Sequence, residues 1–460
     1  MTDVSTGRSA GKFPANFVLR GDIAYSKSPE ELSCREGAFL VCREGVCGGV
    51  FPRLPAEYSP FPLYDYRGKL IIPGLTDLHI HASQFGFRGL GMDMELLDWL
   101  EKRAFPEEAK FHDGGYARRA YGLFVEALRR GPGARFCVFA TIHTEATLIL
   151  QDLLEESGLV SMTGKLSMDR NCPEALREKS AAGALKNAEE WLDLSEKRNY
   201  RNTRPILTPR FIPSCSDELL YSLGKLAQDR GLPVQSHLSE NRREIAWVRE
   251  LCPGASHYAG AYRDFGLFGG EAPAIMAHCV WPEDEELALI KERGVFIAHC
   301  PQSNANVASG IAPVRRLLNL GIAVGLGTDV AGGIHSSIFR AMGDAIQASK
   351  LRKVLGPAAE GSPSGGAEED YRPLGLEEAF WMGSAGGGAL FNAGSFEEGR
   401  EFDALVLDDG DLAAPFPLSV RERLERAVYL SEDRHIIGKW VRGRPLFMIM
   451  PENRFENTGE

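Results

Sequence analysis

The sequence lacks the cysteine pairs and long apolar runs that mark secreted and membrane proteins. Its nine cysteines include no CxxC pair and no regular spacing, which favours reduced thiols over a disulfide framework. No apolar run reaches the roughly 18 residues that a membrane-spanning helix needs. The first residues, MTDVSTGRSAGKF, lack the apolar core of a secretory signal. We therefore expect a cytoplasmic protein that does not enter a membrane.

Basic residues are also fewer than acidic ones. Lys and Arg number 52 against 63 Asp and Glu, which gives a formal net charge of −11. That balance disfavours a general nucleic-acid binder or a protein that binds anionic membranes. The 460 residues exceed one ordinary domain and suggest one large domain with a small one.

From about residue 75 the sequence alternates regularly between two kinds of segment. Short apolar runs, each ending in a polar residue, are followed by amphipathic, helix-like stretches. Strand and helix alternating eight times predict a parallel sheet, and a closed (β/α)8 barrel suits eight repeats better than an open sheet does. The predicted strands are 75–81, 136–141, 163–168, 206–210, 233–237, 275–278, 295–299 and 322–329, and the predicted helices are 116–130, 173–197, 217–230, 242–251, 283–292 and 314–320.

The two ends of the chain contain short β-type runs instead, such as 39–42, 70–72, 403–407 and 440–443. We predict an α/β fold with two parts. A (β/α)8 TIM-type barrel spans residues 74–400, and a small β-sandwich domain is formed by residues 1–73 together with 401–460. Residues 356–373 are rich in Gly, Pro, Ser and Glu and predict a surface loop.

Histidines gather at the predicted carboxyl ends of the strands, where barrels of this type carry their active sites. His79 and His81 close the first strand, and their i, i+2 spacing places both rings on one side. An isolated HxH pair is more often two surface or core histidines. Here, however, His237, His278 and Asp329 close the fifth, sixth and eighth strands. Three histidines and one aspartate make an acceptable catalytic zinc set that leaves a position for water.

The remaining histidines have plainer interpretations. His299 closes the seventh strand, and we expect it to order the pocket rather than bind metal. His143 opens an HxE signature typical of the cytidine-deaminase fold, but that fold also needs PCxxC, which the sequence does not contain. We therefore expect His143 in a loop or pocket wall, and a solvated surface role for His112, His257 and His435.

Six short segments, in order within residues 65–410, carry a family resemblance. They are PGLTDLHIHASQFGF, FATIHTE, LTPRFIPSCS, QSHLSEN, AHCPQSN and GLGTDVAGG. The chain resembles the amidohydrolase superfamily and, within it, the guanine deaminases. The HxH motif and the late Asp are moderately specific for the superfamily. The combination of HIHASQ, TPRF and SHLSEN is much more specific for the guanine deaminases.

The resemblance implies one zinc ion per chain, with His79, His81, His237 and Asp329 as its ligands. Two-metal relatives often use a carboxylated lysine at the end of strand four. Here strand four ends in Arg210, which supports a single metal. By analogy with the family the chain is also expected to form a homodimer.

The activity that the resemblance implies is hydrolytic deamination of guanine to xanthine and ammonia. Glu240 is expected to transfer a proton to ring nitrogen N3, His278 to hold the attacking water, and Asp329 to accept the water's proton. Zinc would lower the pKa of that water to about 7. The substrate-binding residues are expected to be Gln84, Arg210, Phe211, His237, Glu240 and Asp329.

Two departures from the family pattern keep alternatives open. Residues 212–213 are Ile-Pro where Ser-Leu is expected, and the stretch 131–136, GPGARF, differs from the usual Gly-Thr-Thr-Thr lead-in. A retuned substrate range would make the chain a related aminohydrolase acting on another purine, a pterin or a triazine-like heterocycle. The second alternative is a non-catalytic scaffold of the dihydropyrimidinase-related kind, although such proteins usually lack the metal ligands that this chain keeps.

Overall fold

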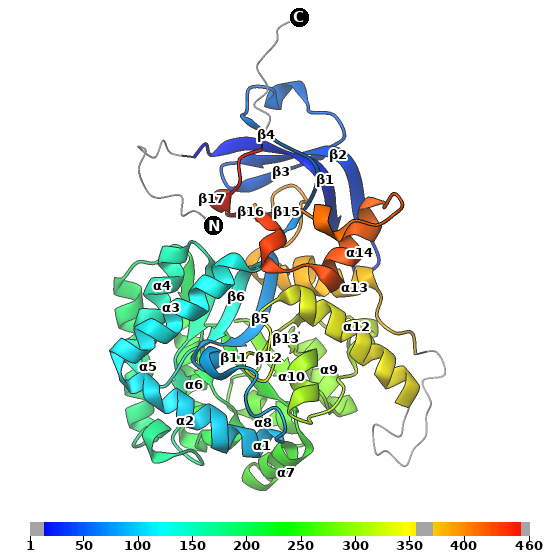
Figure 1. Ribbon diagram of the computed structural model, residues 1–460. Helices are drawn as coiled ribbons and strands as arrows, with labels where there is room; N and C mark the ends of the chain where they lie inside the picture. The colour runs from blue at the N-terminus through cyan, green and yellow to red at the C-terminus, as the bar shows by residue number, and fades with distance from the viewer. Residues whose placement is uncertain (1–12, 356–370, 452–460) are drawn as a thin grey trace, which may run out of the picture.

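The computed structural model describes residues 13–355 and 371–451. Most of the predicted surface loop at 356–373 therefore lies outside the described residues. An α/β body makes up the larger part of the molecule, and a separate β-sheet stands at one end of it (Figure 1). Within the described ranges, no helix is long and apolar enough to cross a membrane.

The strands of the body are parallel and fall where the sequence predicts them. One sheet has the order β5-β6-β7-β9, a second has the order β11-β12-β13-β14, and β8 pairs with β10. The predicted strand at 163–168 is divided into β7 and β8, and the fourth predicted strand appears as β10, with β9 just before it. Their bounds are β5 Leu75–His81, β6 Gly133–Phe139, β7 Val160–Gly164, β8 Leu166–Ser167, β9 Thr203–Pro205, β10 Thr208–Pro209, β11 Val234–Leu238, β12 Ala274–His278, β13 Phe296–His299 and β14 Val324–Leu326.

Backbone hydrogen bonds connect these separate sheets. The amide of Gln235 in β11 donates to the carbonyl of Leu207, at a distance of 2.9 Å. At the other edge the amide of Asp329, just after β14, donates to the carbonyl of His79 in β5 at 2.8 Å, and the amide of His81 donates to Val330 at 3.2 Å. The last strand unit therefore lies beside the first. All seven residues of β5 are buried, as expected for a parallel strand covered on both faces.

Helices surround these strands, and side-chain caps define several of their ends. Asp113 accepts hydrogen bonds from the amides of Gly115 and Tyr116 and so begins α3. The predicted helix at 173–197 begins only at residue 181, because Ser180 caps it through Gly183. Sequence periodicity did not predict α4 or α12. The bounds are α3 Gly114–Arg130, α4 Thr144–Ser157, α5 Ala181–Lys197, α6 Asp217–Arg230, α7 Arg242–Leu251, α8 Tyr258–Asp264, α9 Asp284–Glu292, α10 Pro301–Asn306, α11 Val314–Asn319, α12 Ile338–Leu355 and α13 Leu376–Trp381.

A short helical segment covers the carboxyl ends of the strands. It consists of α1 (Leu96–Trp99), a π-helical turn (Leu100–Ala104) and α2 (Phe105–Glu108). Its apolar side chains Leu96, Trp99 and Leu100 are at most 9% exposed. This segment forms a wall of the site described below.

The two ends of the chain share one seven-stranded sheet of order β17-β16-β15-β4-β1-β2-β3. The two flanks meet where β15 pairs with β4 in antiparallel fashion. Phe17 of β1 and Trp440 of β16 belong to one buried cluster on this sheet. The bounds are β1 Asn16–Ser26, β2 Leu32–Arg43, β3 Val46–Phe51, β4 Leu63–Pro73, β15 Ala404–Leu407, β16 Ile436–Val441 and β17 Arg444–Met448, and α14 is Val420–Leu430.

The expectation of solvated surface roles is wrong for two histidines. His257 is 7% exposed and His435 is 3% exposed. His257 accepts a hydrogen bond from the amide of Gly260 and so caps α8. His435 accepts from the amide of Glu432 at 2.8 Å. Both rings replace helix-end hydrogen bonds that water would otherwise provide. His112 is exposed, as predicted.

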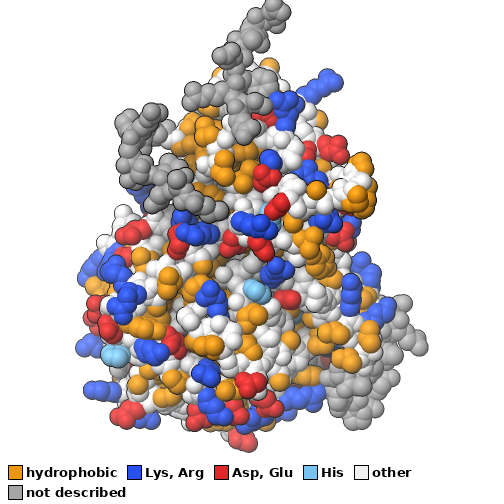
Figure 2. All heavy atoms as spheres, in the orientation of Figure 1, with side chains coloured by type: hydrophobic (Ala, Val, Ile, Leu, Met, Phe, Trp, Pro, Cys, Tyr) orange, Lys and Arg blue, Asp and Glu red, His pale blue; other side chains and the backbone are white. Residues whose placement is uncertain are grey.

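The outer surface carries both signs of charge. On the face drawn in Figure 2, Lys and Arg side chains alternate with Asp and Glu side chains over the body. Many of them pair, as Arg130 does with Glu126 and Arg316 with Asp284. Such exposed pairs contribute little to stability.

Candidate active site

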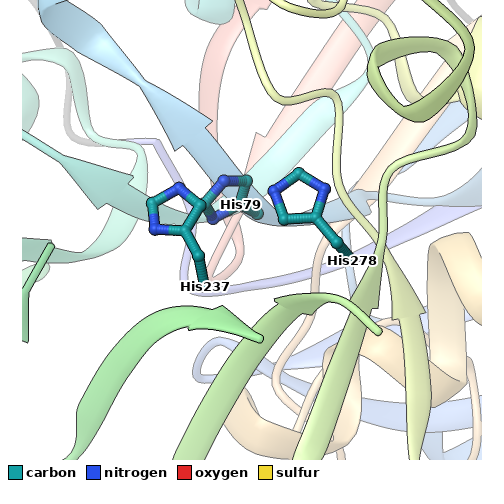
Figure 3. A group of neighbouring side chains, drawn as sticks. All are labelled: His79, His237 and His278. Carbon is teal, nitrogen blue, oxygen red and sulfur yellow. The ribbon is translucent and has the colours of Figure 1, made fainter. Parts of the chain in front are cut away.

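Four histidines and an aspartate from four strand ends converge in the body. His79 and His81 come from β5, His237 from β11 and His278 from β12, and Asp329 follows β14. All five are buried or nearly so in the interior. Figure 3 shows the rings of His79, His237 and His278 directed toward one space. The predicted ends of separate strands thus meet at one point.

The nitrogen and oxygen atoms of this group lie close enough to share an ion. Nε2 of His79 is 3.1 Å from Oδ1 of Asp329, and Nε2 of His81 is 3.4 Å from the same oxygen. Nε2 of His81 is 3.3 Å from Nε2 of His237. Two overlapping groups in the described chain could hold a metal, one formed by His79, His237 and His278 and the other by His79, Cys300 and Asp329.

Hydrogen bonds at Nδ1 fix the orientation of the His237 and His278 rings. Nδ1 of His237 lies 2.6 Å from the carbonyl oxygen of Arg210, and Nδ1 of His278 lies 2.9 Å from Oδ1 of Asn304. Because a carbonyl oxygen only accepts, Nδ1 of His237 donates. The Nε2 lone pair of His237 is then left for the interior of the site, an arrangement typical of metal-binding histidines.

The charges of the cluster follow from its burial. Burial lowers the pKa of His79, and the pKa values of His81 and His237 lie well below the usual range for the same reason. Neutral imidazoles are the form that binds metal. Burial alone would raise the pKa of Asp329, but the neighbouring His79, His278 and His81 hold it below its usual range.

The Glu240 carboxylate lies beside the ring of His278. Its Oε2 is 3.5 Å from Nε2 of His278, and its Oε1 accepts a hydrogen bond from the hydroxyl of Ser309 at 3.0 Å. Burial, followed by the charge of Asp329, raises the pKa of Glu240 to about 8. A carboxyl group with such a pKa holds a proton near neutral pH and can donate it.

One cavity collects nearly all the predicted site residues. Its polar lining residues are His81, Gln84, Arg210, His237, Glu240, Glu244, His278, Ser303 and Asp329, and its apolar lining residues are Leu96, Trp99, Leu100, Phe211 and Val307. His79 lies behind them, against Asp329. Gln84 and Arg210 are 1% and 2% exposed, so bulk water does not compete for their polar groups.

A close backbone contact brings Asp329 to this position. A Cβ atom on Gly327 would meet Cβ of His79 at 2.8 Å and Sγ of Cys300 at 2.8 Å. Only glycine therefore allows the segment after β14 to lie against β5 at this level.

Two histidines at the strand ends take no part in the cavity. His299 is 2% exposed, and its Nδ1 has no hydrogen-bond partner among the described residues. Burial lowers its pKa to about 3. His143 is half-buried at the start of α4 and is absent from the cavity lining. His143 therefore does not form part of the pocket wall, and the expectation that His299 orders the pocket stays a prediction.

Three polar residues that contact the predicted site residues were not predicted, and neither were six residues that line the cavity, Leu96, Trp99, Leu100, Glu244, Ser303 and Val307. Asn304 orients His278, Ser309 contacts Glu240, and Glu108 binds both Gln84 and Arg210. Asn304 lies in the matching segment AHCPQSN, which was a signal. Glu108 and Ser309 carry none, since no motif or spacing separates them from other helical and loop residues.

The chain is similar to known proteins over most of its length. Residues 70–446 match the model of the amidohydrolase family. Guanine deaminase from Dictyostelium discoideum is 36% identical over 390 residues, covering 83% of each chain. Human guanine deaminase is 34% identical over 388 residues, covering 82% of each chain.

A solved structure agrees with the sequence relatives. The guanine deaminase of C. acetobutylicum, with guanine bound in its active site, superposes with a TM-score of 0.88 at 42% identity. The match covers 94% of this chain and 100% of that one. The cavity, with its histidine and aspartate cluster, therefore lies within a fold held in common with these proteins, and the chain belongs to the amidohydrolase family, among its guanine deaminases.

Proposed function

We propose that this chain is a zinc-dependent enzyme that hydrolyses guanine to xanthine and ammonia. The observation that carries the proposal is the single cavity in which a metal-capable histidine and aspartate cluster faces the polar pair Gln84 and Arg210. Its relatives from Dictyostelium discoideum and human are guanine deaminases, and the C. acetobutylicum structure holds guanine.

The proposed metal ligands are His79, His81, His237 and Asp329, one zinc per chain. Zinc–nitrogen bonds of about 2.0–2.1 Å in a tetrahedron separate neighbouring ligand atoms by about 3.3–3.4 Å. The distances among these ligands, 3.1, 3.3 and 3.4 Å, fit that geometry. Nε2 of His79 is buried and lies 3.1 Å from Oδ1 of Asp329 without hydrogen-bond geometry, as two ligand atoms of one cation would.

Asp329 and His278 have separate roles toward the attacking water. Zinc held by these four residues would lower the pKa of a bound water to about 7. Oδ2 of Asp329 lies on the side of His278, 3.8 Å from its Nε2, and so is placed to accept the proton of that water. His278, fixed by Asn304, orients the attacking oxygen toward carbon C2 of the base.

Glu240 completes the reaction by moving protons on the base. It donates its proton to N3 as the water oxygen adds to C2, which makes C2 tetrahedral. The proton that Asp329 has accepted then goes to the amino group, the C2–N bond breaks, and ammonia leaves. Glu240 recovers a proton from the C2 hydroxyl, which becomes the C2 carbonyl, while the N3 proton stays in xanthine. The raised pKa of Glu240 suits a group that donates and recovers a proton in one cycle.

The walls of the cavity give the base its orientation. Arg210 and Gln84 offer N–H groups to the carbonyl edge of guanine, and His237, Glu240 and Asp329 surround the carbon that reacts. Phe211, Trp99 and Leu96 are among the apolar residues that line the cavity, and contact with them removes a flat ring from water. A polar pocket of this kind rejects analogues that leave its buried donors unpaired.

The proposal extends to architecture and assembly. The hydrogen bonds between β5 and the segment after β14 support a closed (β/α)8 barrel at 74–400. The isolated bridge between Val46 of β3 and Glu401 supports folding of the seven-stranded sheet into a small β-sandwich, made of residues 1–73 and 401–460. The nine free thiols support a reducing, cytoplasmic location, and family analogy supports a homodimer.

The test uses metal content and substrate range together. The protein, stripped of metal and reloaded with zinc, should bind about one zinc per chain and release ammonia from guanine. In a panel with adenine, pterins and triazines, guanine should be preferred. His237→Ala should lose most of its metal and nearly all activity. Preference for another heterocycle supports the related-aminohydrolase alternative, and a metal-free, inactive chain supports the scaffold alternative.

A further inference from the structure

One buried carboxylate holds both side chains that are proposed to recognise the base. Oε1 of Glu108 accepts a hydrogen bond from Nε2 of Gln84 at 2.9 Å, and Oε2 accepts one from Nη1 of Arg210 at 2.5 Å. The Glu108 side chain is 0% exposed and that of Arg210 is 3% exposed. Glu108 lies at the end of α2, and the cavity lining does not include it. It therefore acts on the site through its two partners.

The amide of Gln84 is bound on both sides. Its Oε1 accepts from the backbone amide of Ala331 at 3.1 Å, while its Nε2 donates to Glu108. A carboxylate only accepts and a backbone amide only donates. Gln84 therefore has one orientation that satisfies both neighbours, and rotating its amide by half a turn would set oxygen against oxygen and N–H against N–H.

Arg210 is restrained in a comparable way. One Nη1 hydrogen is committed to Glu108, and the guanidinium carbon lies 5.1 Å from the centre of the Phe105 ring. The rest of the rigid guanidinium fork keeps its direction relative to Gln84, because both side chains are tied to one carboxylate.

We propose that Glu108 is the positioning residue that sets the base preference of this site, by fixing which way the Gln84 amide and the Arg210 fork face the cavity. The inference rests on the proposed deamination of guanine. With Glu108 accepting from both side chains, the cavity receives their remaining N–H groups, which suit a carbonyl oxygen on the base. A purine with an amino group at that position offers hydrogens to hydrogens instead.

Replacing Glu108 by Gln makes this idea testable. Arg210 has no acceptor, so the new amide must turn its oxygen to Arg210 and its NH2 to Gln84. Gln84 then either rotates, and loses its bond with Ala331, or faces the new NH2 with its own. In both cases its fixed orientation is lost. The substitution keeps size and shape, which separates this effect from a cavity.

The measurement compares guanine with 2,6-diaminopurine, which carries an amino group in place of the C6 carbonyl and keeps the 2-amino group that is removed. For each zinc-loaded protein, kcat/KM is determined for both bases, with competitive inhibition constants where turnover is slow. In Glu108→Gln the ratio of guanine to 2,6-diaminopurine should fall by roughly ten- to a hundredfold, because the matched donors no longer point at the carbonyl. An unchanged ratio, with guanine and 2,6-diaminopurine affected equally, contradicts the proposal.

Two further variants keep the test decisive. Glu108→Asp retains a group that only accepts but shortens it, so kcat/KM for guanine should fall by roughly tenfold or more while the preference for guanine remains; unaltered kcat/KM contradicts the proposal even where Glu108→Gln does not fold. Glu107→Gln is the matched control, since Glu107 is also mostly buried but pairs with Lys110 and Tyr116. Its ratio should match the wild type. A wild-type protein that does not deaminate guanine refutes the proposed function instead, and is recognised before any variant is measured.

Discussion

The carbonyl oxygen of Arg210 lies 2.6 Å from Nδ1 of His237. The residue proposed to bind the carbonyl edge of the base with its side chain thus orients a proposed metal ligand with its backbone. Metal binding and substrate recognition are joined at this point by the main chain, which a side-chain substitution leaves in place. The two functions can therefore be separated by mutation.

The first prediction follows from that separation. Arg210→Ala removes the guanidinium but keeps the carbonyl that holds His237, so bound zinc should stay near one per chain. The kcat/KM for guanine should fall by roughly a hundredfold or more, because Glu108 is left without its cation and the base without a donor. Elemental analysis and ammonia release on the same sample check both parts. Loss of metal in this variant would mean that the side chain, not the carbonyl, supports the cluster.

Glu240 offers a test of the proton transfer. Glu240→Gln keeps the size of the side chain and its contact with Ser309, but an amide does not donate a proton as an acid does. Turnover of guanine should fall by roughly 10²-fold or more, with zinc content unchanged. Glu107→Gln is the comparison variant and should keep near-normal turnover, because it changes another mostly buried carboxylate that does not line the cavity. Near-normal turnover in Glu240→Gln would rule out the proton-transfer role.

Asp329 is proposed both to bind zinc and to accept the proton of the water, and Asp329→Asn should separate the two roles. An amide oxygen can still bind zinc weakly, and three histidines remain, so zinc occupancy should fall only in part. Activity should fall by roughly 10²–10⁴-fold, since the group that accepts the proton of the water is gone. The useful quantity is activity per bound zinc after full reloading with metal. If that quantity returns to the wild-type value, Asp329 is a ligand only.

How far the sequence predicts this site depends on how each residue reaches it. His79, His81, His237, His278 and Asp329 end apolar strands, and parallel strands bring their carboxyl ends together. Their meeting point therefore follows from pattern alone. Glu108 reaches the site because α2 packs over the strand ends, a tertiary contact that leaves no periodic trace in the sequence. The same reason hides Trp99 and Ser309.

In the fold, too, some elements follow from the sequence pattern and others do not. The predicted strand at 75–81 ends in histidine, and its bounds match β5. The predicted strand at 163–168 is interrupted at Lys165, which separates β7 from β8. The predicted strand at 206–210 is reduced to β10, because Ile206 and Leu207 separate it from β9. Helix α12 was not predicted, since small or polar residues such as Gly343 and Ser349 interrupt the apolar residues of its buried face.

Glu286 provides a prediction about pH and stability away from the metal. It is buried, accepts hydrogen bonds from Ser239 and from the amide of Ala259, and burial raises its pKa to about 7. The folded state therefore holds a proton that the unfolded chain releases near pH 4.5. The contribution of Glu286 to stability is fully present below about pH 4.5 and is lost as pH rises through about 7.

The variant Glu286→Gln removes this titration while keeping the shape of the side chain. Relative to wild type, it should gain stability as pH rises from 5 to 8, by up to roughly 3 kcal/mol for a shift of about 2.5 pKa units. Urea midpoints of both proteins at the two pH values measure the difference. A difference that does not change with pH would mean that Glu286 has the same charge in the folded and unfolded chains.

The most direct test of the account follows the oxygen atom from solvent to product. Zinc-loaded protein is given equal amounts of guanine and adenine in water enriched in heavy oxygen, and the products are identified by mass spectrometry while ammonia is counted. The account predicts xanthine that carries one oxygen from the solvent, one ammonia for each xanthine, and little change in adenine. Faster loss of adenine, or xanthine without the solvent oxygen, would contradict it.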